Sequence, residues 1–200
     1  MKSIHSISIA LVLLISLSCA SRYNLINPRS LNYVGTSEDS GVILQYKYDV
    51  LNSVRNKKYS KKEDKKGVQL VSVKVTNNSP DPVSFIDDVK IYSGEKRILP
   101  MAPKLIHSQL KQNAAIYILY GLLWFTISNC EDGECDNIAI PIGLPIGIGN
   151  IAYAASANKR FLQELEAYNL LNKTIAPGET VYGLVGVEST GFDPLTFEVE

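Results

Sequence analysis

Residues 68–76 read Val-Gln-Leu-Val-Ser-Val-Lys-Val-Thr, and this stretch predicts the class of the fold. Val71, Val73 and Val75 fall on one face of an extended chain, and polar residues alternate with them. A period of two residues is typical of a β-strand that buries one face and exposes the other. We therefore expect a strand here that packs on a core through its valine face.

Further short strands are expected on both sides of this stretch. Residues 42–50 alternate in a similar way, and a cluster of turn residues with Pro80 and Pro82 follows the valine-rich strand. The later segments with strand character are 83–86, 89–92, 96–99, 180–188 and 195–199. About seven short strands at this spacing are typical of two packed sheets. The sequence therefore predicts a mainly β protein with an immunoglobulin-like β-sandwich.

The order of these elements is similar to that of the small immunoglobulin-like modules of many bacterial envelope lipoproteins. The similarity rests on the valine-rich strand, the Asn-Asn-Ser turn at 77–79 and the Pro-Gly-Glu turn at 177–179. It covers roughly half of the chain. The resemblance implies a binding or structural module and no catalytic residues.

Two long uncharged segments, 114–128 and 138–157, interrupt the pattern of strands. As a helix, the first would reach only about 22 Å, less than the ~30 Å hydrocarbon core of a bilayer. Prolines and glycines interrupt the second. We therefore expect an inserted hydrophobic helical hairpin that is shallow, re-entrant or covered by protein. The expected membrane-contacting residues are Leu122, Leu123, Trp124, Phe125, Ile142, Ile146 and Ile148.

The tip of this insertion is a short acidic loop between two cysteines. In an oxidising compartment, Cys130 and Cys135 are expected to form a disulfide across a turn that Gly133 permits. The alternative is a metal site, in which the carboxylates of 131–136 would hold a calcium ion loosely. A closed zinc site needs four sulfur or imidazole ligands, and His107 is the one histidine beyond the N-terminal segment. We predict neither a metal nor a cofactor.

The N-terminal residues have the features of a secretory signal. Lys2 precedes an apolar run at 7–17 that is too short to span a bilayer. The Ser-Leu-Ser-Cys that follows resembles a lipobox, the motif whose cysteine becomes the lipid-modified first residue of a bacterial lipoprotein. Ser16 stands where that motif usually has leucine. The resemblance implies an acyl anchor on Cys19, and ordinary secretion with a cut after Ala20 is the alternative.

The charge balance bears on possible partners. Twenty basic and 20 acidic residues cancel, which argues against nucleic acid. One stretch, 55–66, departs from this balance because it holds seven basic and two acidic residues. We interpret it either as a solvated hairpin loop or as a patch that touches the phosphates of anionic lipid headgroups.

No catalytic constellation emerges from the sequence, because His107 stands alone and the acidic pair Asp87 and Asp88 lies near a turn. We therefore expect a non-enzymatic envelope lipoprotein of the outer membrane that acts as a binding or structural module. Its acyl anchor and its hairpin would contact membrane lipid. The alternative is an oligomeric membrane-assembly protein whose hydrophobic hairpins pack together, with the small residues Gly143, Gly147 and Ala152 at the seam.

A last helix completes the expected division of the chain. Residues 159–172 place Phe161, Leu165 and Tyr168 on one helical face. The predicted parts are a signal peptide at 1–18, a lipid-anchored tether at 19–40, the first part of the sandwich at 41–100, the hydrophobic hairpin insertion at 101–158, the amphipathic helix at 159–172 and the last strands at 173–200.

Overall fold

The computed structural model describes residues 19–131, 134–189 and 191–200, so the predicted signal peptide at 1–18 lies outside the described residues. The chain forms two compact units. Unit 1 comprises residues 1–22 and 112–157, and unit 2 comprises residues 23–111 and 158–200. The chain therefore passes from one unit to the other three times.

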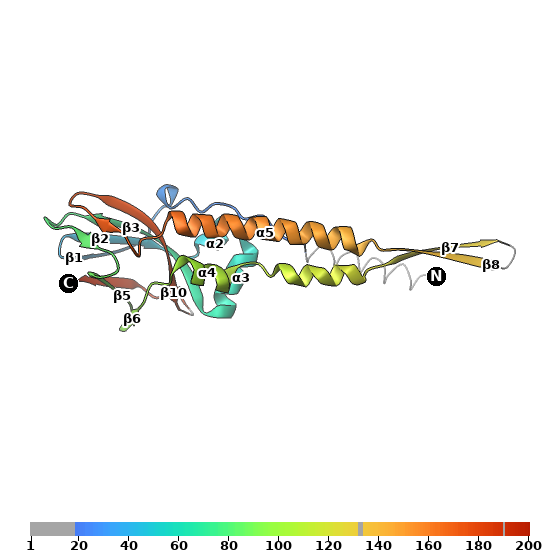
Figure 1. The fold of residues 1–200 in the computed structure, drawn as a ribbon. Helices are drawn as coiled ribbons and strands as arrows, with labels where there is room; N and C mark the ends of the chain where they lie inside the picture. Colours follow the sequence, from blue (N-terminus) through green and yellow to red (C-terminus); the bar gives the residue numbers. More distant parts are fainter. Residues whose placement is uncertain (1–18, 132–133, 190) are drawn as a thin grey trace. The chain divides into compact units, whose positions relative to one another are not determined.

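A four-stranded antiparallel sheet is the frame of unit 2 (Figure 1). Its strand order is β1-β2-β3-β10, so the valine-rich strand β3 lies inside the sheet. The pairing of β3 with β10 runs without a break from Val68 opposite Glu188 to Thr76 opposite Thr180. The strands of this sheet are β1 (Gly35–Asp39), β2 (Val42–Lys47), β3 (Val68–Asn77) and β10 (Thr180–Glu188).

Two smaller sheets complete the strands of unit 2. One has the order β11-β5-β6, and the other pairs β4 with β9. Apolar side chains of all three sheets share one buried core, in which Val73 of the main sheet joins Phe197 and Ile175 of the smaller ones. The strands are β4 (Val83–Ser84), β5 (Val89–Ser93), β6 (Lys96–Ile98), β9 (Thr174–Ile175) and β11 (Leu195–Val199).

β3 buries both of its faces, whereas its alternating pattern predicts one. The hydroxyl of Ser72 is fully buried, and it lies 3.0 Å from the hydroxyl of Tyr33 and donates to the carbonyl of Gly183 at 3.4 Å. Ile106 packs on Gly186 of the neighbouring strand, where a Cβ would fall 2.6 Å from its side chain. Helical and N-terminal segments therefore cover the face that the sequence assigns to solvent.

The prediction of an immunoglobulin-like sandwich with an inserted helical hairpin is wrong. The fold is mixed, with 34% strand and 33% helix, and its strands form several small sheets. The predicted loop at 55–66 is mostly helix, because Tyr59 and Glu63, one turn apart, face the interior. The helices and 3-10 segment in this part are η1 (Pro28–Ser30), α2 (Val50–Ser53), α3 (Lys57–Lys66) and α4 (Pro103–Leu110).

The long helix α5 (Gly143–Ala167) begins 16 residues before the helix predicted at 159–172 and ends before Tyr168. Its last turns belong to unit 2, where Phe161 and Leu165 are fully buried. Tyr168, the third residue of the predicted face, is half-buried beyond the helix end. The ring of Phe161 packs on Tyr23 and Tyr59, with centroid distances of 5.1 and 4.9 Å.

A buried carboxylate fixes the N-terminal segment of unit 2. Glu164 accepts hydrogen bonds from the hydroxyl of Tyr23 at 2.6 Å and from the backbone N–H groups of Ile26 and Asn27 at 2.9 and 3.0 Å. Burial and the charge of Glu164 raise the pKa of Tyr23, which keeps this hydroxyl protonated as a donor. Residues 23–39, predicted as a tether, therefore belong to the folded unit.

We predict that Glu164→Ala lowers the free energy of unfolding by about 3 kcal/mol, because it leaves buried N–H and O–H donors without an acceptor. Urea denaturation followed by circular dichroism measures this change. Glu166→Ala is the matched control, since Glu166 is exposed on the same helix. Equal effects of the two substitutions would contradict the role given to Glu164.

Glu63 is a second buried acid, 2% exposed. Its Oε1 accepts the N–H of Leu70 at 2.8 Å. The pKa of this carboxyl is raised from 4.5 to about 8. Burial is the largest cause, the hydrogen bond from Leu70 acts in the opposite direction, and the negative charges of Asp49 and Asp64 add to the increase. The folded chain therefore favours the protonated form of Glu63.

We predict that the free energy of unfolding falls as the pH rises from about 4.5 to about 8. Over this range the unfolded chain releases the proton of Glu63 readily, whereas the folded chain must either keep the proton or bury a charge. Glu63→Gln keeps an acceptor for Leu70 and removes this dependence. The variant should be the more stable protein at pH ~8.5, by a few kcal/mol at about 1.4 kcal/mol for each pKa unit. Parallel pH profiles of parent and variant in urea denaturation would refute the prediction.

Candidate functional site

Unit 1 contains the candidate site, and its elements follow one another along the chain. A 3-10 helix is followed by a two-stranded antiparallel hairpin and then by the first turns of α5. The predicted helical hairpin is thus replaced by a β-hairpin with a helical segment on either side. The elements are η2 (Ala114–Leu122), β7 (Phe125–Glu131), β8 (Glu134–Ile140) and α5.

Two glycines let η2 and α5 approach closely. A Cβ on Gly147 would lie 2.7 Å from the carbonyl oxygen of Tyr117, and one on Gly143 would overlap the carbonyl oxygen of Tyr120. Both glycines are buried, whereas Ala152 is exposed on the same helix. The three small residues considered for an oligomer seam therefore do not share a face, and two of them pack inside unit 1.

Most of the large apolar side chains of unit 1 point away from this contact. Leu122 is 76% exposed and Ile148 is 66% exposed, as polar surface residues usually are. The exposed large apolar residues of unit 1, which we call the apolar surface, are Ile116, Ile118, Leu119, Leu122, Trp124, Phe125, Ile127, Ile138, Ile140, Ile142, Leu144, Ile146, Ile148 and Tyr153.

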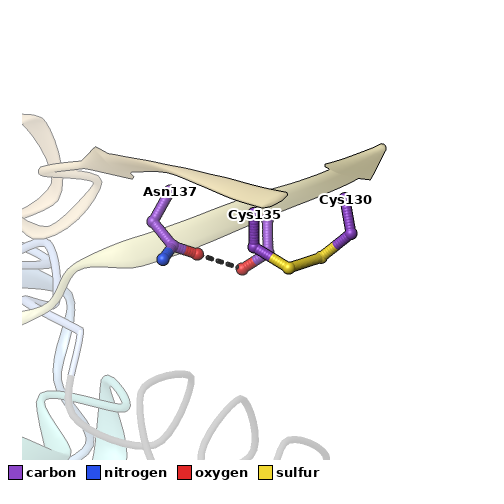
Figure 2. Close-up of a disulfide and its surroundings, with 4 residues drawn as sticks. Cys130, Cys135 and Asn137 are labelled. Atoms are coloured by element: carbon purple, nitrogen blue, oxygen red, sulfur yellow. Dashed lines mark hydrogen bonds between the residues drawn. A yellow bond between two sulfur atoms is a disulfide. The ribbon is translucent and has the colours of Figure 1, made fainter. Parts of the chain in front are cut away.

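One face of the β-hairpin is apolar in the half farther from the turn and carries Asp136 and Glu134 in the half nearer to it. Its register places Phe125 opposite Ile140 and Ile127 opposite Ile138, so these four side chains share a face. The other face carries the disulfide between Cys130 and Cys135 (Figure 2). On that face the hydroxyl of Ser128 donates to the side-chain oxygen of Asn137 at 2.5 Å.

The acidic residues of the segment 112–157 are close together in the sequence, around the turn of the hairpin. Within residues 112–157 the sequence holds four ionisable carboxylates, and all of them lie between 131 and 136. In the part of this segment that the structure describes, Glu134 and Asp136 are exposed. Contact of the apolar surface with lipid would therefore have to leave this end of the hairpin in water.

The predicted membrane-contacting residues mostly lie on this surface. Leu122, Trp124 and Phe125 are exposed, as are the three isoleucines predicted on the second segment. Leu123 is half-buried, and its carbonyl accepts the N–H of Gly143 at 3.0 Å. The predicted set of membrane-contacting residues does not include Ile127, Ile138 and Ile140. The alternation of apolar residues within 125–127 and 138–140 is a strand pattern that could have predicted their exposure on one face.

Cys19 lies in the same unit as the apolar surface and is exposed. The two residues that follow it are held by side chains of unit 1. The N–H of Ala20 donates to Asn150 at 2.6 Å, and the backbone of Ser21 exchanges two hydrogen bonds with Gln112 at 3.1 and 2.7 Å. The backbone next to Cys19 is therefore hydrogen-bonded to side chains of unit 1.

His107, the histidine weighed for metal binding, lies on α4 in unit 2. Its Nε2 is 3.1 Å from the carbonyl oxygen of Asn158, and burial together with the charge of Lys111 lowers the pKa of the ring. Within residues 19–131, 134–189 and 191–200, no three His, Cys, Asp or Glu residues are grouped so that they could hold a metal ion.

Comparison of the chain with protein-family models, with curated proteins and with solved structures found no match. Among the helices in the described part of the chain, none is both long and apolar enough to cross a membrane.

We predict that Gly147→Ala destabilises unit 1 by about 1–3 kcal/mol, because the added methyl group would collide with the backbone of η2. Trp124, the single tryptophan, lies in unit 1 and reports its unfolding by fluorescence. Gly149→Ala is the matched control, since a Cβ there meets nothing within 4 Å. It should stabilise the helix by up to about 1 kcal/mol. A destabilising effect of the same size at both positions would contradict the packing described here.

Proposed function

We propose that the chain is a lipid-anchored protein of the bacterial cell envelope, and of its outer membrane, in which unit 1 contacts a lipid surface. Unit 2 would serve as the binding or structural module. The observation that carries the proposal is the apolar surface of unit 1. Soluble monomers rarely expose contiguous apolar patches larger than a few hundred Å² outside a site of interaction.

The position of Cys19 supports the same proposal. The multiple acyl chains that the lipobox resemblance implies would anchor the protein firmly by themselves. An acyl group on Cys19 would start on the unit that also carries the apolar surface. The apolar surface would then orient unit 1 against the membrane and would not be needed to secure it.

The physical character of the surface suits the boundary of a lipid bilayer. Trp124 and Tyr153 combine an apolar ring with a polar N–H or O–H group, and such residues favour the boundary between water and hydrocarbon. Most of the other residues of the apolar surface are isoleucine or leucine. The carboxylates at the hairpin end would stay in water, since their transfer into hydrocarbon is costly.

We predict that the chain with Cys19→Ala, which has no acylation site, still binds phosphatidylcholine vesicles in a flotation assay. Leu122→Asp together with Trp124→Asp should release it, because each charge would enter the lipid phase at a cost of roughly 2–3 kcal/mol. Circular dichroism should stay unchanged, since both side chains are exposed.

The matched control for this experiment is Val34→Asp with Leu99→Asp. Both residues are apolar, more than two-thirds exposed and part of unit 2. This pair should leave vesicle binding unchanged. Release by both pairs, or a Cys19→Ala chain that stays soluble and monomeric without lipid, would overturn the proposed role of unit 1.

We predict that Cys19 is acylated in bacteria, which tests the anchor separately. Metabolic labelling with a palmitate analogue should mark the parent chain and leave Cys19→Ala unlabelled. Cys130→Ser with Cys135→Ser is the control, and it should retain the label. A mature N-terminus at Ser21 without modification would show secretion in place of lipid anchoring.

A further inference from the structure

Helix α3 of unit 2 carries an unusual concentration of one charge. Six of its ten residues are lysines. At 3.6 residues per turn they cover about half of the circumference, while Tyr59 and Glu63 occupy the buried side. Lys61, Lys65 and Lys66 are exposed.

Lys111, the residue that follows α4, joins this group. The ammonium group of Lys62 donates to the backbone carbonyl of Lys111. This hydrogen bond holds the exposed Lys111 beside α3. Burial lowers the pKa of Lys62, and the positive charges of Lys66, Lys111 and Lys65 lower it further. The ammonium groups are therefore close enough to repel one another.

Helix α3 holds two carboxylates against its six lysines. Lysines of α3 face each other across one turn in pairs such as Lys61 with Lys65 and Lys62 with Lys66, which destabilise a helix. Glu63 is buried, and Asp64 is the other acid of the helix. The ion pairs Lys90–Glu200 and Lys173–Glu179 of the described residues do not involve Lys61, Lys62, Lys65, Lys66 or Lys111. A bound anion would supply the missing negative charge.

We propose that Lys61, Lys62, Lys65, Lys66 and Lys111, the basic surface, bind the phosphate groups of anionic lipid headgroups. This inference rests on the proposed function and adds the class of lipid that the protein would select. Each ammonium group near an anionic membrane strengthens binding roughly fivefold. Nucleic acid fits less well, because the chain as a whole has no net charge and the basic surface contains no arginine for base recognition.

The test compares vesicles of phosphatidylcholine alone with vesicles that also contain phosphatidylglycerol, using the Cys19→Ala chain. We expect tighter binding to the anionic vesicles, and this excess should shrink as salt is added. The variant Lys61→Gln, Lys65→Gln and Lys66→Gln should lose at least about tenfold in affinity for the anionic vesicles and keep its affinity for the neutral ones. Lys62 is left unchanged because it holds Lys111.

The matched control removes the same net charge from two strands of unit 2, by the substitutions Lys47→Gln, Lys96→Gln and Arg97→Gln. The inference is overturned if this control loses as much affinity as the α3 variant, or if the α3 variant binds anionic vesicles like its parent. Tighter binding of double-stranded DNA than of anionic vesicles at equal salt would also overturn it.

The two proposals fail in different ways. Binding to anionic vesicles through these lysines, with no binding to neutral ones, would support the basic surface and contradict the proposed role of the apolar surface. Equal affinity for both kinds of vesicle, lost in the Leu122→Asp and Trp124→Asp chain, would support the apolar surface and refute the basic surface.

Discussion

The antiparallel pairing of β3 with β10 is the constraint on which the rest of the fold depends. It joins residues that lie between 104 positions apart, at Thr76 and Thr180, and 120 positions apart, at Val68 and Glu188. Closing a loop of this length costs chain entropy, which nine paired residues and the valine core offset. Residues 112–157 lie inside this loop, and the segments on both sides of them belong to unit 2. Unit 1 is therefore held at both ends by a core that it does not contribute to.

Local features of the fold could be predicted from the sequence, and features that depend on distant contacts could not. The strands predicted at 180–188 and 195–199 are found at those residues, because alternation is a property of neighbours in the chain. The helix α3 has no apolar period to reveal it, since Tyr59 is its one aromatic or aliphatic residue. The buried position of Tyr23 depends on Glu164, 141 positions away, and no pattern near residue 23 shows this.

The start of α5 shows how a correct rule led to a wrong prediction. Proline breaks helices in their interior, but Pro145 stands in the first turn, where its missing N–H would have no intrahelical partner. Gly147 weakens a helix in isolation, yet here it permits the contact with Tyr117. Composition alone was enough to identify the uncharged segments of the candidate site. The two faces of the hairpin required the register of its strands.

The hydrogen bonds of Ala20 and Ser21 have a consequence for the reach of the protein. In the proposed anchored form, a single residue would separate the acyl group from backbone that Asn150 and Gln112 already hold. A long flexible linker lets a tethered domain explore a wide volume and dilutes it near any one target. With almost no linker, unit 1 could not move far from the lipid surface. Even weak contacts between the apolar surface and the bilayer would then be occupied most of the time.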